Sequence, residues 1–253
     1  MGVQVRFVVA TVAVVAACWL VACGAGETFD SKKLRLVDYD ATTGNFLFRS
    51  NDPLTPSGSF DWTGLTGRMA EVAANASIQF PADDDLFMMD FSLLSPLLPK
   101  ERANLKVEEA YFAANATRGK LISWPLVGSV DDANKLHEAV RKDLAKALPK
   151  DMIDKLPSRI PYLHSLVHTP SSHGKPLVVV VHCEGGMDRT GESIGSYYLQ
   201  YLGWSYAKVL AYNDAIDNRN MSTTTGNALN WYCWYLYYAF GSQFSYLKCD
   251  LPH

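Results

Sequence analysis

The 253-residue sequence lacks a strong charge of either sign. Its 23 Lys and Arg residues face 26 Asp and Glu residues, for a formal net charge of −3, and the basic residues are scattered. This distribution favours neither a nucleic-acid surface nor a patch for anionic membranes. Internal repeats and low-complexity segments are also absent, which argues against repeat architectures. With 48% hydrophobic residues, the chain can bury a sizeable core, and we expect one domain over residues 27–253.

Long apolar runs are scarce as well. The main one, residues 7–22, is shorter than the roughly 20 residues that a membrane-spanning helix needs. It follows Arg6 and precedes small residues, a layout that predicts a signal peptide over residues 1–24, with a signal anchor as the alternative. Residues 20–23 would also fit a bacterial lipidation box. Three glycosylation acceptors instead favour a eukaryotic secreted or luminal glycoprotein: Asn75, Asn115 and Asn220.

Cysteine is limited to five residues, and removal of the signal segment would leave Cys183, Cys233 and Cys249. An odd number in an oxidising compartment predicts one free thiol. Cys233 and Cys249 lie close together near the C-terminus, whereas Cys183 lies in a glycine-rich turn. We therefore predict a Cys233–Cys249 disulfide and a free Cys183.

The hydrophobic pattern alternates between strand-like and helix-like segments. Strands are expected in "GNFLFRS", "DLFMMDFSLL", "KLISWPLVG" and "PLVVVVH". The last has no polar alternation, which is typical of a parallel strand buried on both faces. Residues 129–148 predict an amphipathic helix with Ser129 as N-cap. Its expected apolar face comprises Ala133, Leu136, Val140, Leu144 and Leu148.

Further helices are expected in "IDKLPSRIPYLHSLVH", "GESIGSYYLQYLG", "SYAKVLAYNDAI" and "NALNWYCWYLYYAF". The last has aromatic residues on every face, which indicates a helix packed inside the protein. Together these segments predict an α/β fold with a central parallel or mixed β-sheet flanked by helices.

The stretch "KPLVVVVHCEGGMDRTGES", residues 175–193, places a thiol at the end of the buried strand. In open α/β sheets, ligands bind beyond the carboxyl ends of the strands, where a strand turns into a helix. Five residues separate Cys183 from Arg189, enough for a loop whose backbone N–H groups curl inward around an anion. Gly185 and Gly186 permit the backbone conformations that such a loop needs.

This loop predicts a site for a tetrahedral dianion. A helix that starts near Thr190 adds the positive end of its dipole. The same field favours a thiolate at Cys183, which is the nucleophilic form of cysteine. Arg189 is then placed to hold two phosphate oxygens with its planar fork, which a lysine cannot do.

The segment from His182 to Gly191 resembles the signature of the cysteine-dependent protein tyrosine phosphatase superfamily, in which His-Cys is followed by five residues and Arg-Thr-Gly. The version here, "HCEGGMDRTG", is similar to the tyrosine phosphatase branch that carries "DRTG" in this loop, a feature shared in part with myotubularin-type lipid phosphatases. The resemblance implies a tyrosine-phosphatase-like fold.

Two weaker similarities lie upstream. "NFLFRSNDP", with Arg49 and Ser50, resembles the strand that this branch carries near its N-terminus. "FMMDFS" resembles the next strand, which ends in Asp-Leu-Arg in the family, although Phe91 and Ser92 replace the last two residues. The resemblance covers roughly residues 36–226, but only the 182–191 segment is specific.

By this resemblance, Cys183 attacks phosphorus to give a phosphocysteine, which water then hydrolyses. Arg189 stabilises the charged oxygens, Thr190 offers its hydroxyl to the thiolate, and His182 orients the loop. The residues expected to bind substrate are Glu184, Gly185, Gly186, Met187, Asp188 and Arg189. No cofactor is implied. A zinc site at His164, His168 and His173 is not expected, because the sequence places no carboxylate or cysteine beside them.

The proton donor must differ from that of the best-known members of the family, which carry an aspartate directly after Trp-Pro. Here Trp124-Pro125 is followed by Leu126, which cannot donate a proton. Asp188 is the preferred donor, because the thiolate and the bound phosphate would favour its protonated form. Asp131 and Asp132 are the alternatives, although acids in the first turn of a helix are also explained by its dipole.

These observations predict a secreted or luminal phosphatase for phosphotyrosine-type monoesters in proteins or small molecules. The five loop residues between Cys183 and Arg189 include no base, and the apolar Met187 would rather meet an aromatic ring than a second phosphate. A phosphoinositide or inositol phosphate phosphatase is the alternative, if Lys100, Arg102 and Lys106 form a loop that faces the site. An inactive phosphate-binding module is a further one. We expect a membrane partner only if the signal segment is retained.

Overall fold

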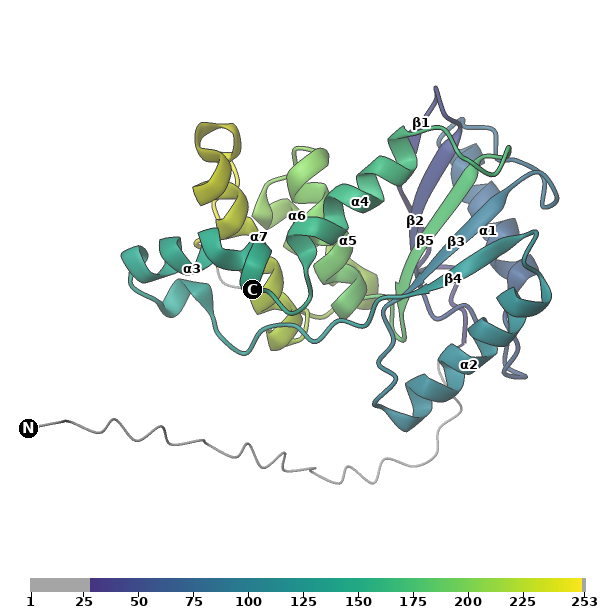
Figure 1. Cartoon of the computed structure of the whole chain (residues 1–253), viewed down its shortest axis with the longest axis horizontal. Helices are drawn as coiled ribbons and strands as arrows, with labels where there is room; N and C mark the ends of the chain where they lie inside the picture. The colour runs from purple at the N-terminus through teal and green to yellow at the C-terminus, as the bar shows by residue number, and fades with distance from the viewer. Residues whose placement is uncertain (1–27, 252–253) are drawn as a thin grey trace, which may run out of the picture.

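A computed structural model describes residues 28–251, so the predicted signal peptide lies outside the described residues. The centre of the fold is a five-stranded sheet with the order β1-β2-β5-β3-β4 (Figure 1). Its strands are β1 (Arg35–Asp40), β2 (Asn45–Asn51), β3 (Phe87–Ser92), β4 (Gly119–Ser123) and β5 (Leu177–Cys183). Only β1 runs antiparallel to its neighbour, while β2, β5, β3 and β4 are parallel. The predicted α/β fold with a mixed central sheet is confirmed.

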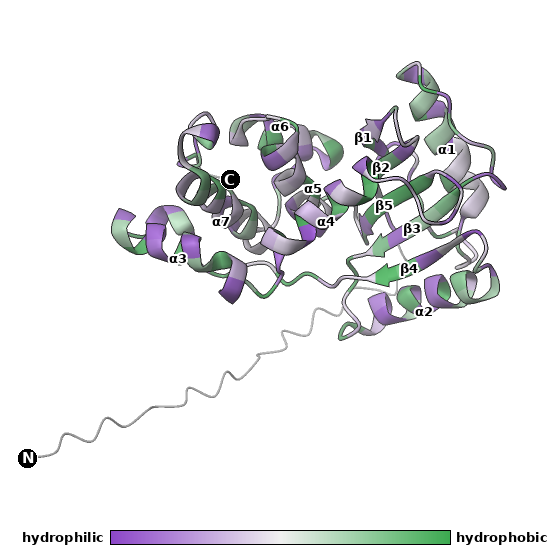
Figure 2. Ribbon diagram, turned by 45° about the horizontal axis from the view of Figure 1, so that its top comes forward, coloured by the Kyte–Doolittle hydropathy of each residue, from purple (hydrophilic) through white to green (hydrophobic). Residues whose placement is uncertain are grey.

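The valines of β5 are shared between two hydrophobic cores, one on each face of the sheet. Val178 and Val180 pack into the first core with residues of α1 (Trp62–Asn75) and α2 (Pro99–Ala114). Val179 and Val181 pack into the second, larger core with residues of α4 (Leu156–His168) and α5 (Asp188–Tyr201). Figure 2 shows the resulting band of apolar residues along β5. The absence of polar alternation in this strand thus reflects burial on both faces.

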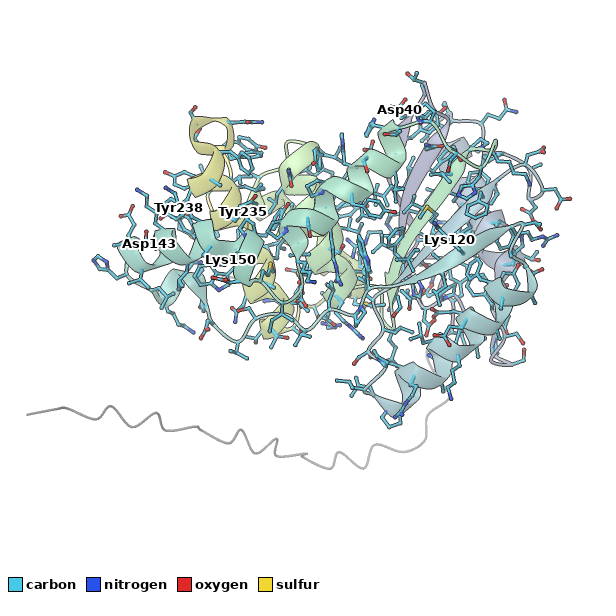
Figure 3. The ribbon with its side chains drawn as sticks, viewed as in Figure 1. Asp40, Lys120, Asp143, Lys150, Tyr235 and Tyr238 are labelled. Carbon is cyan, nitrogen blue, oxygen red and sulfur yellow. A yellow bond between two sulfur atoms is a disulfide. The ribbon has the colours of Figure 1, made fainter. Side chains whose placement is uncertain are left out.

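Three helices extend the second core away from the sheet: α3 (Glu138–Asp151), α6 (Tyr206–Asp217) and α7 (Thr223–Phe240). Helix α7 lies between α3 and α5, with Tyr235 and Tyr238 on α7 and Asp143 and Lys150 on α3 (Figures 1 and 3). Its buried aromatic side chains include Trp231, Tyr232 and Trp234. The prediction of an aromatic C-terminal helix packed inside the protein is confirmed.

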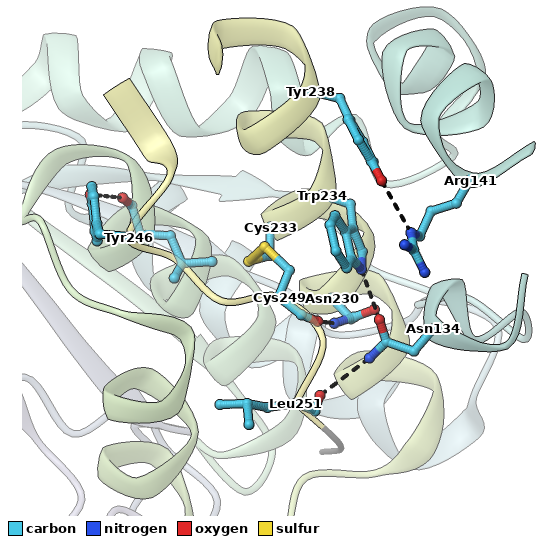
Figure 4. Close-up of a disulfide and its surroundings, with 10 residues drawn as sticks. Asn134, Arg141, Asn230, Cys233, Trp234, Tyr238, Tyr246, Cys249 and Leu251 are labelled. Atoms are coloured by element: carbon cyan, nitrogen blue, oxygen red, sulfur yellow. Dashed lines mark hydrogen bonds between the residues drawn. A yellow bond between two sulfur atoms is a disulfide. The ribbon is translucent and has the colours of Figure 1, made fainter. Parts of the chain in front are cut away.

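A disulfide between Cys233 and Cys249 fastens the C-terminal segment to α7 (Figure 4). Beside it, the Asn230 side chain donates a hydrogen bond of 2.7 Å to the carbonyl oxygen of Cys249. Cys183 is the free cysteine among residues 28–251. Both predictions from the cysteine count are confirmed for the described residues.

The helix predicted over residues 129–148 is wrong in its first half. A short 3₁₀ helix covers Ala133–Lys135, and α3 begins only at Glu138. The chain breaks because two side chains cap two separate helices: Asp132 accepts from the backbone N–H of Asn134, and His137 from that of Ala139. Two residues of the expected apolar face, Val140 and Leu144, are exposed as a result.

Helix α2 replaces the loop in which we expected Lys100, Arg102 and Lys106. Pro99 occupies its first turn, where a proline costs no helical hydrogen bond. Two of its acidic side chains, Glu101 and Glu108, are buried, so a simple apolar stripe does not mark it in the sequence. None of the helices in the described part of the chain is long and apolar enough to cross a membrane.

Candidate active site

Cys183 ends β5 at the carboxyl edge of the sheet, where β2 and β3 also end. Asn51 lies opposite Cys183 in the β2–β5 register, and His182 lies between Ser50 and Ser92 of the neighbouring strands. The loop 183–189 then leads directly into α5, which begins at Asp188. The predicted strand–loop–helix arrangement is thus present, with Cys183 only 2% exposed at its base.

The backbone of the loop is fixed at Gly186. This residue has a φ of +69°, a conformation that glycine adopts without strain. A Cβ atom there would lie 2.7 Å from the backbone nitrogen of Asn51, so a side chain does not fit either. The carbonyl oxygen of Gly186 accepts a 2.9 Å hydrogen bond from the buried Arg49, whose same Nη2 atom donates to Asn213 of α6 at 2.7 Å. Arg49 therefore ties the loop to α6.

Arg189 is oriented by a carboxylate that our sequence reasoning missed. Its Nη1 and Nη2 atoms donate to the two carboxylate oxygens of Glu101 at 2.7 and 2.6 Å, and Nη1 also donates to the carbonyl oxygen of Leu93 at 3.1 Å. Three of the five guanidinium N–H groups are thus engaged. The remaining two, on Nε and Nη2, form a second fork that can hold two oxygens of an anion.

The pair is electrostatically stable at neutral pH. Burial opposes the charged form of Glu101, but the hydrogen bonds from Arg189 and from the backbone of Ser95 outweigh it and lower the pKa of Glu101. Burial likewise opposes the charge on Arg189, yet the Glu101 carboxylate raises the pKa of Arg189 above its ordinary value. Glu101 lies on α2, 88 residues before Arg189. No local sequence pattern therefore points to the contact.

His182 faces a group of buried carboxylates on the side of the sheet away from α5. Its Nε2 atom lies 3.0 Å from Asp90 Oδ1 and 3.9 Å from Glu108 Oε2, and all three side chains are fully buried. Burial lowers the pKa of His182, but Asp90 and Glu108 outweigh it and raise this pKa to about 10. Burial also raises the pKa values of Asp52 and Glu108. We infer that an imidazolium next to Cys183 is balanced by acids that share protons.

Among the described residues, Asp52, Glu108 and His182 form the one group with side-chain atoms close enough to hold a metal ion. The 3.0 Å contact of His182 with Asp90 is a hydrogen-bond distance, and Asn104 donates to Asp52 at 2.5 Å. Within residues 28–251, both ring nitrogens of His182 and both carboxylate oxygens of Glu108 lack a hydrogen-bond partner of good geometry. We expected no zinc site at His168 because the sequence places no carboxylate beside it. In the fold, however, carboxylate oxygens of Asp38 and Asp40 lie 3.0 and 2.7 Å from the two ring nitrogens of His168.

Asp188, the preferred proton donor, is held as an ionised carboxylate. It accepts two hydrogen bonds from Arg219, at 3.1 and 2.7 Å, and one of 2.6 Å from the backbone of Ser222 at the start of α7. Burial opposes the charge, but these contacts outweigh it and lower the pKa of Asp188. This is the opposite of the shift we expected. The cause is Arg219, a residue 31 positions away that the loop sequence does not reveal.

The alternative donors lie on the segment after β4. Asp132 caps the 3₁₀ helix Ala133–Lys135 and pairs with Lys135 at 3.3 Å. Asp131 is exposed, and its backbone carbonyl accepts from the Trp231 indole. None of these contacts involves the loop 183–189.

The other loop residues differ in what they can offer to a ligand. The Glu184 side chain forms a salt bridge with Lys100 of α2, and the Gly185 carbonyl accepts from Lys33 at 3.0 Å. Met187 is fully buried in the second core. Our expectation that its thioether meets the substrate is therefore wrong, because only its backbone remains available. Thr190 is fully buried, and its hydroxyl has no hydrogen-bond partner within residues 28–251.

Known proteins resemble this chain only distantly. No family model matches the chain, and no curated protein matches it. Among solved structures, TpbA of P. aeruginosa matches with 13% identity and a TM-score of 0.37, over 81% of this chain and 96% of that one. A cysteine-to-serine form of TpbA in complex with pTyr matches with 13% identity and a TM-score of 0.38, over 82% and 97% of the two chains.

Proposed function

We propose that this protein is a phosphatase that hydrolyses phosphomonoesters of the phosphotyrosine type through a phosphocysteine intermediate. The observation that carries the proposal is the loop 183–189: a nearly buried thiol at the end of β5, a backbone curled at Gly186, and the free fork of Arg189. The helix dipole of α5 adds its positive end to the same place. A secreted or luminal location remains part of the proposal, supported by the cysteine count and the signal-like N-terminal sequence.

In the first step, the Cys183 thiolate forms a bond to phosphorus while the bond from phosphorus to the leaving oxygen breaks. The imidazolium of His182 stabilises the thiolate electrostatically, and the buried Thr190 hydroxyl is available as its hydrogen-bond donor. Backbone N–H groups and Arg189 hold the equatorial oxygens. In the second step, a water oxygen bonds to phosphorus, the sulfur–phosphorus bond breaks, and the thiolate is restored with release of inorganic phosphate.

The leaving oxygen needs a proton, and Asp188 remains our proposed donor. Because Arg219 keeps Asp188 ionised in the unliganded protein, Asp188 must take up a proton with the substrate. A phosphate monoester bound as its monoanion brings that proton into the site. While Asp188 carries this proton it is neutral, so its ion pair with Arg219 is weakened. Asp188 would then donate the proton to the leaving oxygen.

The surroundings of the loop support monoesters over polyphosphorylated substrates. Three basic side chains do reach the loop region, but each has an acidic partner: Lys33 pairs with Asp217, Lys100 with Glu184, and Arg219 with Asp188. Arg189 is paired in the same way with Glu101. Because each positive charge that contacts the loop is paired with an acid, the loop itself offers no excess charge to the additional phosphates of an inositol polyphosphate.

The test is a comparison of substrates and variants of the full chain. We expect higher kcat/KM on a phosphotyrosine peptide than on a phosphoserine peptide, phosphoinositides or inositol hexakisphosphate. Cys183→Ser should abolish turnover while vanadate still binds, because the anion site consists of backbone and Arg189. Arg189→Lys should also be severe, since a single point charge replaces the fork. Arg68→Lys, on α1, is the matched control and should retain activity, because Arg68 also pairs with a glutamate but lies away from the loop.

Three outcomes would contradict the proposal. Turnover that survives in Cys183→Ser would exclude the phosphocysteine. Phosphotyrosine binding without turnover in the unmodified protein would instead indicate an inactive phosphate-binding module. A kcat/KM at least tenfold higher on any inositol substrate than on the phosphotyrosine peptide would instead favour a phosphoinositide or inositol phosphate phosphatase.

A further inference from the structure

Two leucines stand exposed at the turn that leads into α2. Leu97 is 85% exposed and Leu98 is 52% exposed, and neither belongs to the two hydrophobic cores. Soluble domains often expose single leucines, so exposure alone does not indicate a binding surface. Here, however, the two are consecutive and sit between Pro96 and Pro99, in a turn whose shape is fixed. The Ser95 backbone donates to Glu101 at 2.6 Å, and Leu98 donates to the Ser95 carbonyl at 3.2 Å.

This turn, residues 95–99, is attached directly to the catalytic loop. The next residues of α2 are Lys100, which pairs with Glu184, and Glu101, which holds Arg189. The exposed leucines are therefore held beside the mouth of the site rather than on a remote surface. Whatever they contact will lie next to a phosphate bound in the loop.

The exposed charges within residues 95–107 are all positive, although Lys100 is paired with Glu184 of the loop. In residues 95–107, the basic residues Lys100, Arg102 and Lys106 are exposed, whereas the one acid, Glu101, is buried. Two adjacent apolar side chains beside exposed bases are the combination that binds an anionic lipid surface. The three bases lie within seven consecutive residues, and α2 holds them directly after the exposed leucines.

The described chain also begins at this edge. The carbonyl oxygen of Thr28 accepts a 2.8 Å hydrogen bond from Asn51, the β2 residue opposite Cys183, and the adjacent Asp52 accepts from Asn104 of α2. Figures 1 and 2 both place the start of the described chain beside the start of α2. The apolar run 7–22 is separated from Thr28 by the five residues 23–27. Five residues span at most about 18 Å.

We propose that the turn 95–99 and the first turns of α2 dock on an anionic membrane surface, so that the catalytic loop faces the lipid headgroups. Leu97 and Leu98 enter the boundary between headgroups and acyl chains, and Arg102 and Lys106 lie at the phosphates. Retention of residues 7–22 as an anchor would place the same edge against the same membrane. The inference goes beyond the proposed activity and does not depend on it, because docking is measured without substrate.

The experiment is sedimentation of the full chain with phosphatidylcholine vesicles, with and without phosphatidylserine. Leu97→Asp/Leu98→Asp should reduce binding at least about tenfold, and Arg102→Glu/Lys106→Glu should remove the gain from phosphatidylserine, which we expect to be about fivefold per charge. Two matched controls lie away from the site. Val130→Asp/Ile153→Asp changes equally exposed apolar residues, and Lys142→Glu/Lys146→Glu changes two exposed bases at the same spacing on α3. Both controls should bind like the unmodified chain.

Residues 7–22 are identical in all variants, so differences between them report the turn itself. Hydrogen exchange of the vesicle-bound chain gives an independent answer, with protection expected in residues 95–107. The proposal is overturned if the α2 variants bind like the controls, or if that segment gains no protection. A higher KM for a phosphotyrosine peptide, with vesicle binding unchanged in Leu97→Asp/Leu98→Asp, would identify the turn as a peptide contact instead and equally reject the membrane.

Discussion

Replacing Glu101 by Gln should disable the site without changing Cys183, the proposed nucleophile. The carboxylate of Glu101 is 4% exposed and accepts two hydrogen bonds from Arg189. A glutamine can accept one of them, but its amide group would turn a donor toward the second guanidinium nitrogen. One charge-assisted hydrogen bond is therefore lost, which is worth about 1.5–3 kcal/mol. Because this pair orients Arg189, the lost hydrogen bond should misplace the Arg189 fork that is proposed to bind phosphate.

At about 1.4 kcal/mol per factor of ten, this corresponds to a fall in kcat/KM of roughly 10- to 100-fold. The assay is kcat/KM on p-nitrophenyl phosphate and on a phosphotyrosine peptide, with Tm measured in parallel to confirm folding. Glu109→Gln is the matched control, since Glu109 lies on the same helix but is exposed. A folded Glu101→Gln protein within about twofold of the unmodified kcat/KM would refute the argument that Glu101 orients Arg189.

Other perturbations test other parts of the site and fold. Removing Arg219 by Arg219→Gln should raise the pKa of Asp188, so a donor role predicts that the alkaline limb of the kcat profile moves to higher pH; an unmoved limb would argue against Asp188. Loss of the disulfide in Cys233→Ser/Cys249→Ser should cost about 3 kcal/mol, read as a lower denaturation midpoint, and an unchanged midpoint would show that it adds no stability. Burial raises the pKa of Glu108 above its ordinary 4.5, because the folded protein favours the protonated acid. The contribution of Glu108 to stability is therefore fully present below pH 4.5 and is lost as the pH rises. The Tm gain of Glu108→Gln should therefore grow as the pH rises above 4.5, and a constant difference would show that Glu108 does not titrate on folding.

The sequence was most informative where the signal is local. The valine run, the cysteine at its end and the glycine-rich loop lie within residues 175–193, and each has a structural reason that acts over a few residues. Gly186 illustrates this, because a positive φ and a close backbone approach both demand glycine. The cysteine pairing was also predictable, since a count and one sequence separation sufficed.

Contacts between distant segments could not be predicted in this way. Glu101, Asp90 and Arg219 set the charge states of Arg189, His182 and Asp188, yet each comes from a different element. The error over Asp188 arose because its neighbours in the loop are known from the sequence and its strongest partner is not. Met187 was misjudged for a similar reason: the loop turns this side chain inward to the core, and the spacing of residues does not reveal that direction.

The sharing of β5 between two cores has a consequence for how the protein unfolds. Because Val178 to Val181 contribute alternately to both faces, neither core can open without releasing this strand. The backbone amides of β5 should therefore exchange only through global unfolding, at the slow end of the range seen in native proteins. Cys183 ends this strand, so the proposed nucleophile belongs to the last part of the molecule to open, and partial unfolding elsewhere should leave its position intact.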